Sequence, residues 1–94
     1  RKADYIHYFQ LVIESNKADY FVYQGKPNLA LPFYFRERDA SKLYKEKKIA
    51  TSALYNIALV YYLTARYQEA QHYIDSALLI DPRFNEGING TLVV

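Results

Sequence analysis

The hydrophobic residues of the N-terminal half recur at the spacing of an α-helix. Over residues 3–24 they form one stripe, which only Ser15 interrupts, with members Tyr8, Leu11, Val12, Ala18, Phe21 and Val22. Gly25 ends this predicted helix, and Pro27 suits the first turn of the next one. The second stripe consists of Ala30, Phe33, Tyr34, Ala40 and Tyr44. We expect the connection to the following helix over residues 45–48.

The helical pattern is clearest over residues 51–82. One face of the first predicted helix carries Leu54, Ile57, Ala58 and Tyr61, at spacings of three and four residues. After a short break at residues 65–67, the second helix carries Ala70, Tyr73, Ile74, Ala77 and Leu78. Asp81-Pro82 ends it, because the residue before a proline disfavours the helical conformation. So short a break predicts an antiparallel helical hairpin, and the chain as a whole is predicted to be all-α.

An internal repeat relates the two halves of the chain. Five residues of the first half align with residues of similar type 40 positions later. Ala18, Phe21, Gly25, Ala30 and Tyr34 align with Ala58, Tyr61, Ala65, Ala70 and Ile74. The second copy, at residues 51–84, resembles a tetratricopeptide repeat. The positions that this family uses for packing are Leu54, Ile57, Ala58, Tyr61, Ala70, Ile74, Ala77 and Pro82. Ala65 departs from the glycine usual in the turn, and the first copy is degenerate because it has Lys17 and Glu37 where leucine and alanine are expected.

The resemblance implies a fragment of an α-solenoid made of stacked antiparallel helical hairpins. We expect a single domain over residues 1–94, with a degenerate repeat at about 11–50, the clear repeat at 51–84 and a tail at 85–94. The 40-residue spacing resembles long-helix variants found in bacterial regulatory and signalling proteins. Such hairpins need neighbours to bury their hydrophobic faces, and two are fewer than the usual three. Since the chain also begins at Arg1, we expect either missing flanking sequence or self-association.

The resemblance also implies a groove lined by the first helix of each repeat, which holds a partner peptide. In the clear repeat the residues expected to line it are Ser52, Tyr55, Asn56, Leu59, Tyr62 and Leu63. Packing against the second helix of the preceding repeat is an alternative role for the same stripe, and the two roles can coexist. Asn56 matches the position where some family members hold a partner's terminal carboxylate. The cationic residues of such a clamp are replaced here by Ser15 and Asp19, which argues against this mode of binding.

Composition narrows the functional classes further. The chain has 12 basic and 10 acidic residues, a net charge of +2, which argues against a mainly phosphate-binding protein. Residues 36–48 hold six basic and three acidic side chains, a mixture that favours a solvated helix face over a nucleic-acid patch. There is no cysteine, and His7 and His72 lie far apart without metal-ligand spacing. We expect no catalytic residue, no metal, no cofactor and no membrane span.

The predicted function is therefore a non-catalytic module that binds a protein or peptide partner. A purely structural module for homo-oligomerisation and a sensor segment of a bacterial regulator are the alternatives. The chain contains 11 tyrosines, and this side chain, with a large apolar body and a polar tip, is typical of binding faces. The sequence identifies neither the partner nor the compartment.

Overall fold

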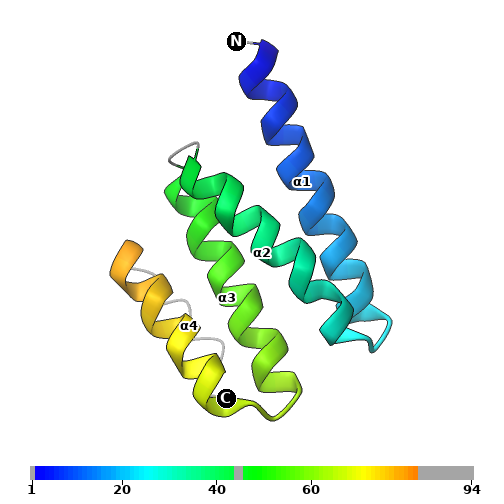
Figure 1. The fold of residues 1–94 in the computed structure, drawn as a ribbon, viewed down its shortest axis with the longest axis vertical. Helices are drawn as coiled ribbons and strands as arrows, with labels where there is room; N and C mark the ends of the chain where they lie inside the picture. Colours follow the sequence, from blue (N-terminus) through cyan, green and yellow to red (C-terminus); the bar gives the residue numbers. More distant parts are fainter. Residues whose placement is uncertain (1, 44–45, 83–94) are drawn as a thin grey trace.

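The computed structural model describes residues 2–43 and 46–82 of the chain, and these form four α-helices (Figure 1). The helices are α1 (Lys2–Tyr23), α2 (Pro27–Leu43), α3 (Lys47–Leu63) and α4 (Tyr67–Ile80). The all-α fold expected from the sequence is confirmed. None of the described helices is both long enough and apolar enough to cross a membrane. The tail expected at residues 85–94 lies outside the described residues.

The start of α3 differs from the expected boundary. Residues 45–48 were expected to connect the two hairpins, but α3 already begins at Lys47, and its first bond joins the Ala50 amide to the Glu46 carbonyl at 2.9 Å. Neither glycine nor proline stands between Lys47 and Thr51 to interrupt the helix, and lysine is a good helix former. The other boundaries lie within a residue or two of the expected ones, with α4 ending before Asp81-Pro82.

The turns within the two hairpins have the same hydrogen bonds, 40 residues apart. In the first turn the Lys26 amide donates to the Phe21 carbonyl and the Gly25 amide to the Val22 carbonyl, at 2.9 and 3.0 Å. The second turn repeats these bonds from Arg66 to Tyr61 and from Ala65 to Tyr62, at 2.7 and 3.1 Å. This is the Schellman arrangement, whose turn residue takes a left-handed conformation. Gly25 has a φ of 76° and Ala65 a φ of 60°, so the alanine holds a conformation that suits glycine.

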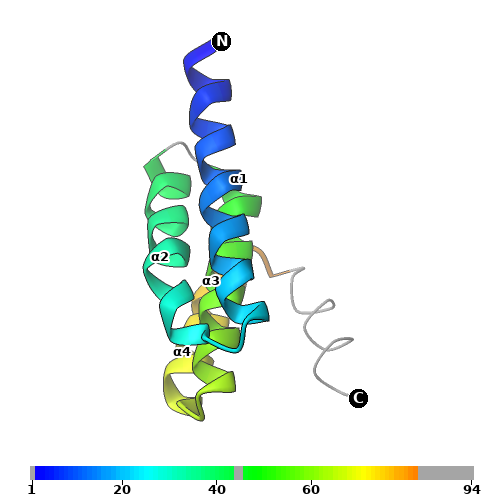
Figure 2. The ribbon, with the colours of Figure 1, turned by 90° about the vertical axis from the view of Figure 1, so that its right-hand side faces the viewer.

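Each helix packs against the next one in the sequence, and one hydrophobic core runs through both hairpins. In the side view of Figure 2, α1 and α3 lie in one layer and α2 and α4 in the other. The buried cluster at the centre of the core consists of Ala18, Ala30, Tyr34, Leu54, Ile57, Val60 and Ala77. Because both hairpins contribute to this cluster, neither buries its hydrophobic face alone.

Aromatic packing repeats with the same 40-residue period. The rings of Phe21 and Phe33 stack with centroids 5.6 Å apart in the first hairpin. Tyr61 and Tyr73 stack at 5.5 Å in the second. Part of the tyrosine excess therefore joins the helices of one hairpin. The two hairpins share their turn geometry and their aromatic contact, although few of the paired residues are identical.

Candidate binding groove

A hollow of about 240 Å³ opens between α1 and α3, the first helices of the two hairpins. On the α1 side it is lined by Tyr8, Leu11, Val12, Ser15 and Asn16. On the α3 side it is lined by Lys48, Ile49 and Ser52. Glu37 of α2 also lines it, and we refer to this site as the α1–α3 hollow. Its walls combine hydrophobic side chains with hydroxyl, amide and carboxyl groups, as ligand sites do.

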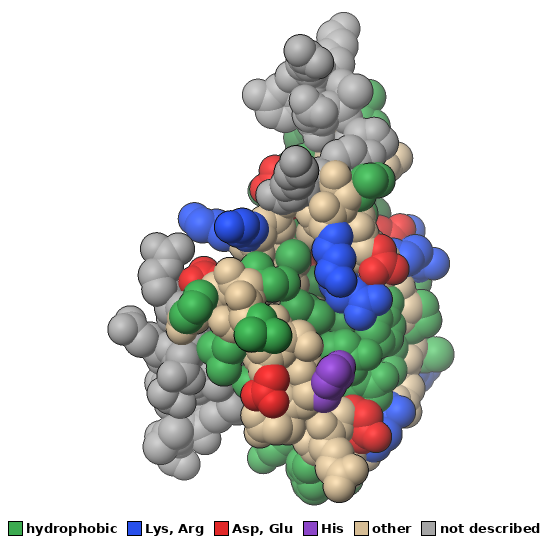
Figure 3. All heavy atoms as spheres, turned by 60° about the vertical axis from the view of Figure 1, so that its left-hand side comes forward, with side chains coloured by type: hydrophobic (Ala, Val, Ile, Leu, Met, Phe, Trp, Pro, Cys, Tyr) green, Lys and Arg blue, Asp and Glu red, His purple; other side chains and the backbone are tan. Residues whose placement is uncertain are grey.

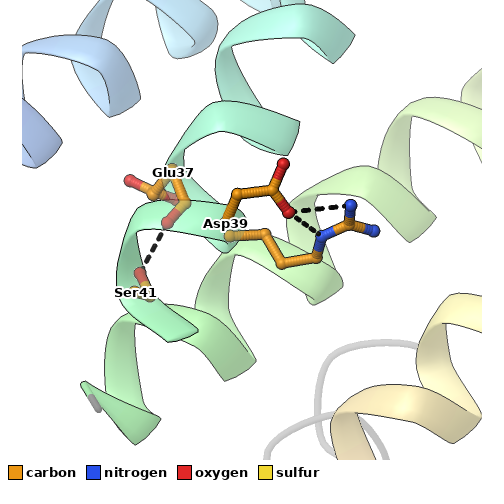
Figure 4. A network of polar contacts seen from close by, with 4 residues as sticks. Glu37, Asp39 and Ser41 are labelled. Atoms are coloured by element: carbon orange, nitrogen blue, oxygen red, sulfur yellow. Dashed lines mark hydrogen bonds and ion pairs between the residues drawn. The ribbon is translucent and has the colours of Figure 1, made fainter. Parts of the chain in front are cut away.

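Glu37 is buried, with only 4% of its surface exposed. Its neighbour Asp39 on the same helix is exposed and accepts hydrogen bonds from Arg38, the closer at 2.9 Å. Figure 4 shows the side chains of Glu37 and Asp39 leaving α2 on different sides. The Ser41 hydroxyl donates to the Glu37 backbone carbonyl at 2.6 Å, so this bond involves the backbone of Glu37 and not its carboxyl group. Helical periodicity, with two residues turning about 200°, separates the buried acid from the exposed one.

A cluster of four polar side chains joins α1 to α2 around Glu37. The Tyr34 hydroxyl donates a hydrogen bond to Asp19, and Ser15 hydrogen-bonds to the Glu37 carboxyl group. In the second hairpin the equivalent positions hold Tyr55, Leu59, Ile74 and Ala77. The first hairpin thus has a polar cluster where the second packs hydrophobic groups. This replacement places hydrogen-bonding groups beside the hollow.

Burial governs the electrostatics of the cluster. It raises the pKa of the Glu37 carboxyl group to about 7, the Ser15 hydrogen bond lowers that pKa, and the negative charge of Asp19 raises it further. Burial also raises the pKa of the Tyr34 phenol well above its usual range, and the hydrogen bond to Asp19 and the charges of Asp19 and Glu37 act in the same direction. Glu37 therefore changes its charge near neutral pH, whereas Tyr34 stays protonated.

The residues expected to line the groove are spread along α3. Ser52 lines the α1–α3 hollow, and Tyr55, Asn56 and Leu59 follow it along the helix as half-buried residues. Tyr62 and Leu63 are more than half exposed, and Tyr62 makes an edge-to-face contact with Tyr67 of α4 at 5.5 Å. Leu63 comes 11 residues after Ser52, about 16 Å along a helix axis. The structure therefore brings Ser52, but neither Tyr62 nor Leu63, to the hollow.

The residues expected to pack the clear repeat are mostly inside. Those buried in the structure are Leu54, Ile57, Ala58, Ala70 and Ala77. Tyr61 and Ile74 are half-buried, and Pro82 is exposed just beyond the end of α4. The small side chains of Ala58, Ala70 and Ala77 let α3 and α4 approach closely. The part of the groove that belongs to α3 therefore rests on a packed hairpin.

The charged segment 36–48 is not a uniformly solvated face, and for Glu37 that expectation is wrong. Arg36 pairs with Glu14 of α1 at 3.2 Å, and Arg38 pairs with Asp39 at 2.9 Å. Glu37 is turned inward because it lies on the side of α2 that packs against α1. Within residues 2–43 and 46–82, no three histidine or acidic side chains come together as a metal site requires.

Sequence reasoning missed Glu37, Ser15, Asp19 and Tyr34 as a group. In the sequence Glu37 is a departure from the repeat pattern, and Asp19 is a replacement for a cationic residue of the carboxylate clamp. The available signal was the position itself: a carboxyl group stands where the clear repeat has the fully buried Ala77. Aligning the two halves predicts a buried acid at that position, although it does not predict the hollow.

Comparison with protein-family models, with curated proteins and with solved structures finds no match to this chain.

Proposed function

We propose that this chain is a non-catalytic module that binds a segment of a protein or peptide partner in the α1–α3 hollow. The single observation that carries the proposal is the hollow itself. It lies between the first helices of two hairpins that share their turn geometry, and it combines hydrophobic walls with hydrogen-bonding groups. The repeated turns also support the tetratricopeptide-like arrangement that the sequence suggests, in which the first helices line the binding groove.

A blocking variant tests this function. Peptides are selected from a displayed random library on the wild-type protein, and their dissociation constants are measured by fluorescence anisotropy. Ser52→Trp fills the hollow, and we expect it to weaken the selected peptides by about tenfold or more. Gln68→Trp is the matched control, because it adds the same ring at an exposed position of α4. Peptides that bind Ser52→Trp as tightly as the wild type, or a selection that yields no binder, would contradict the proposal.

Homo-oligomerisation is a second candidate, and one face of α1 favours it. Ile6, Phe9, Ile13 and Tyr20 of α1 each have at least half of their surface exposed. A second hollow, of about 590 Å³, lies on this face between Ile13 and Phe33. Exposed hydrophobic surface of this kind is typical of an interaction site.

The internal repeat shows that equivalent positions are covered in α3 but exposed on this face of α1. Ile13 and Tyr20 of α1 correspond to Ala53 and Val60 of α3, which are fully buried. α3 packs against both α2 and α4, whereas α1 packs chiefly against α2. The surface around α4, at the opposite end of the bundle, also carries hydrophobic side chains, which lie there among acidic and basic ones (Figure 3).

Light scattering after size exclusion tests this second role. If copies associate through α1, Ile13→Asp yields a monomer, whereas Leu43→Asp, at an exposed position near the end of α2, leaves the association intact. A wild-type protein that stays monomeric at high concentration would exclude the role. Ser52→Trp then separates the two functions, because it fills the hollow on the α3 side and leaves Ile13 on the exposed face of α1 unchanged.

A further inference from the structure

The Glu37 carboxyl group is a buried acid without a cationic partner. The side chains that line the α1–α3 hollow include one other charged group, the exposed Lys48, and among the described residues no ion pair engages Glu37. Buried charges in proteins are normally paired, because an isolated one loses its hydration without compensation. Ser15 supplies one hydrogen bond, and Asp19 adds a second negative charge nearby. When Glu37 is ionised, the base of the hollow therefore has a negative potential, and the exposed Lys48 is the one lining side chain of opposite charge.

We propose that the α1–α3 hollow receives a basic side chain, lysine or arginine, of the bound segment, whose charge pairs with Glu37. This inference rests on the proposed binding function and names the chemistry of its ligand. Leu11, Val12 and Ile49 offer hydrophobic walls to the aliphatic part of such a side chain. Ser15 and Ser52 offer hydroxyl oxygens that can accept hydrogen bonds from its nitrogen atoms.

The size of the hollow fits one long side chain. Its volume is about 240 Å³, several times the roughly 30 Å³ that one water molecule takes up in the liquid, so a side chain several atoms long has room to enter. An acidic ligand would bring a second negative charge towards Glu37 and Asp19. Lys48 is exposed at the surface, where its charge is solvated and screened, and so opposes a cationic ligand only weakly. The Lys48 ammonium group can instead donate a hydrogen bond to a backbone carbonyl of the bound segment, or pair with an acidic residue next to the inserted one.

Such pairing links binding to the protonation of Glu37. The pKa of the free carboxyl group is raised to about 7 by burial, so much of it is protonated at slightly acidic pH. A bound cation favours the ionised form, and binding then releases a proton. The other titratable groups around Glu37 are Asp19 and Tyr8 on α1, Tyr34 on its own helix and Lys48 on α3. We expect the affinity for the cation to rise about tenfold between about pH 6 and about pH 8, where Glu37 loses its proton.

The experiment uses small probes and the intact chain. Backbone amide shifts are followed by NMR during titration with N-acetyl-lysine N-methylamide, with the neutral norleucine analogue and with the glutamate analogue. The lysine probe should shift the amides of Leu11, Ser15, Glu37 and Ser52, with a dissociation constant about tenfold or more below that of norleucine. Its affinity should follow the stated pH dependence.

Two variants make the test specific. Glu37→Gln keeps the shape of the side chain and removes its charge, so the preference for lysine and its pH dependence should both disappear. Asp39→Asn, two residues along α2, removes an exposed charge and should bind the lysine probe like the wild type. The spectrum of each variant also reports whether it is folded.

The possible failures are distinguishable. If norleucine shifts the same amides with equal affinity, or if Glu37→Gln keeps the preference for lysine, the inference is wrong while binding in the groove stands. A preference for the glutamate probe would assign the hollow to Lys48 and also overturn the inference. If no probe shifts these amides the inference fails, and the proposed function is then judged on its own by the Ser52→Trp comparison.

Discussion

Glu37 occupies in the first hairpin the position that Ala77 occupies in the second, and both side chains are buried. The alanine lets α3 and α4 approach closely, whereas the glutamate places a carboxyl group beside a hollow between α1 and α3. Burying a carboxylate costs free energy that a methyl group does not. Glu37 therefore destabilises the first hairpin in a way that packing does not require. Such a destabilising residue is expected where a position serves binding.

Replacing the Glu37 carboxyl group with an amide should change how stability depends on pH. The pKa of this group is about 7 in the folded protein against an ordinary value of 4.5, so between these values the native state binds more protons than the unfolded state. The free energy of unfolding therefore falls as the pH rises through this interval, and the loss is complete above about pH 7. At about 1.4 kcal/mol per pKa unit the loss is on the order of 3 kcal/mol.

We expect Glu37→Gln to be more stable than the wild type at pH 8 by about 1–3 kcal/mol, with the difference shrinking towards pH 4.5. Urea denaturation at several pH values measures it. Asp39→Asn serves as the control and should stay within about 0.5 kcal/mol of the wild type, because Asp39 is exposed. A difference between Glu37→Gln and the wild type that does not vary with pH would show that Glu37 is not buried as described.

Exchanging the residues of the two turns tests their shared geometry. Ala65 has a φ of 60°, which costs an alanine about 1 kcal/mol relative to glycine, so Ala65→Gly should stabilise the protein by up to about that amount. The reciprocal Gly25→Ala should destabilise it by a similar amount. A Cβ at Gly25 would meet no atom within 4 Å, so backbone conformation alone is tested. Thermal unfolding of both variants measures the effects, and equal effects of the same sign would contradict the left-handed assignment.

The hydrogen bond from Tyr34 to Asp19 should contribute to stability as a coupled pair. Tyr34 is buried and its phenol stays protonated, so it donates to the carboxylate throughout the neutral range. We expect Tyr34→Phe to lower the free energy of unfolding by about 1–2 kcal/mol. In a double-mutant cycle with Asp19→Ala, the loss from both changes should fall short of the sum of the single losses. Additive losses would mean that the two side chains do not interact.

Truncating equivalent residues in the two hairpins should have unequal effects. Val60 is fully buried, and Val60→Ala should cost about 1–2 kcal/mol. Tyr20 is its counterpart on the exposed face of α1, and Tyr20→Ala should cost less than about 0.5 kcal/mol in the monomer. Urea denaturation at low protein concentration, where the chain is monomeric, measures the loss of unfolding free energy in both variants. A large cost for Tyr20→Ala would show that another surface covers this face.

The positions of the helices and turns follow from local sequence. Gly25 followed by Pro27 ends one helix and starts the next, and Asp81-Pro82 ends α4, because the backbone limits of these residues act without tertiary contacts. Residues 45–48 were placed less well, since no such residue marks that connection. The repeat was also visible in the sequence, and it placed Gly25 and Ala65 at equivalent positions.

The candidate site was predicted only in part. Ser52 was expected to line a groove and does line the hollow, but Tyr62 and Leu63 lie further along the same helix. Helical periodicity tells which residues share a face. It does not tell which part of that face a neighbouring helix approaches, because that depends on how the hairpins pack.

The four helices, the two hairpin turns and the 40-residue repeat that relates them all follow from local sequence. Tertiary structure decided that Glu37 is enclosed by α1 and α2, that a hollow remains between α1 and α3, and that Ile13 and Tyr20 stay uncovered. The physical reason is that backbone preferences act within a few residues, whereas burial and the pKa of a carboxyl group depend on segments brought together from distant parts of the chain.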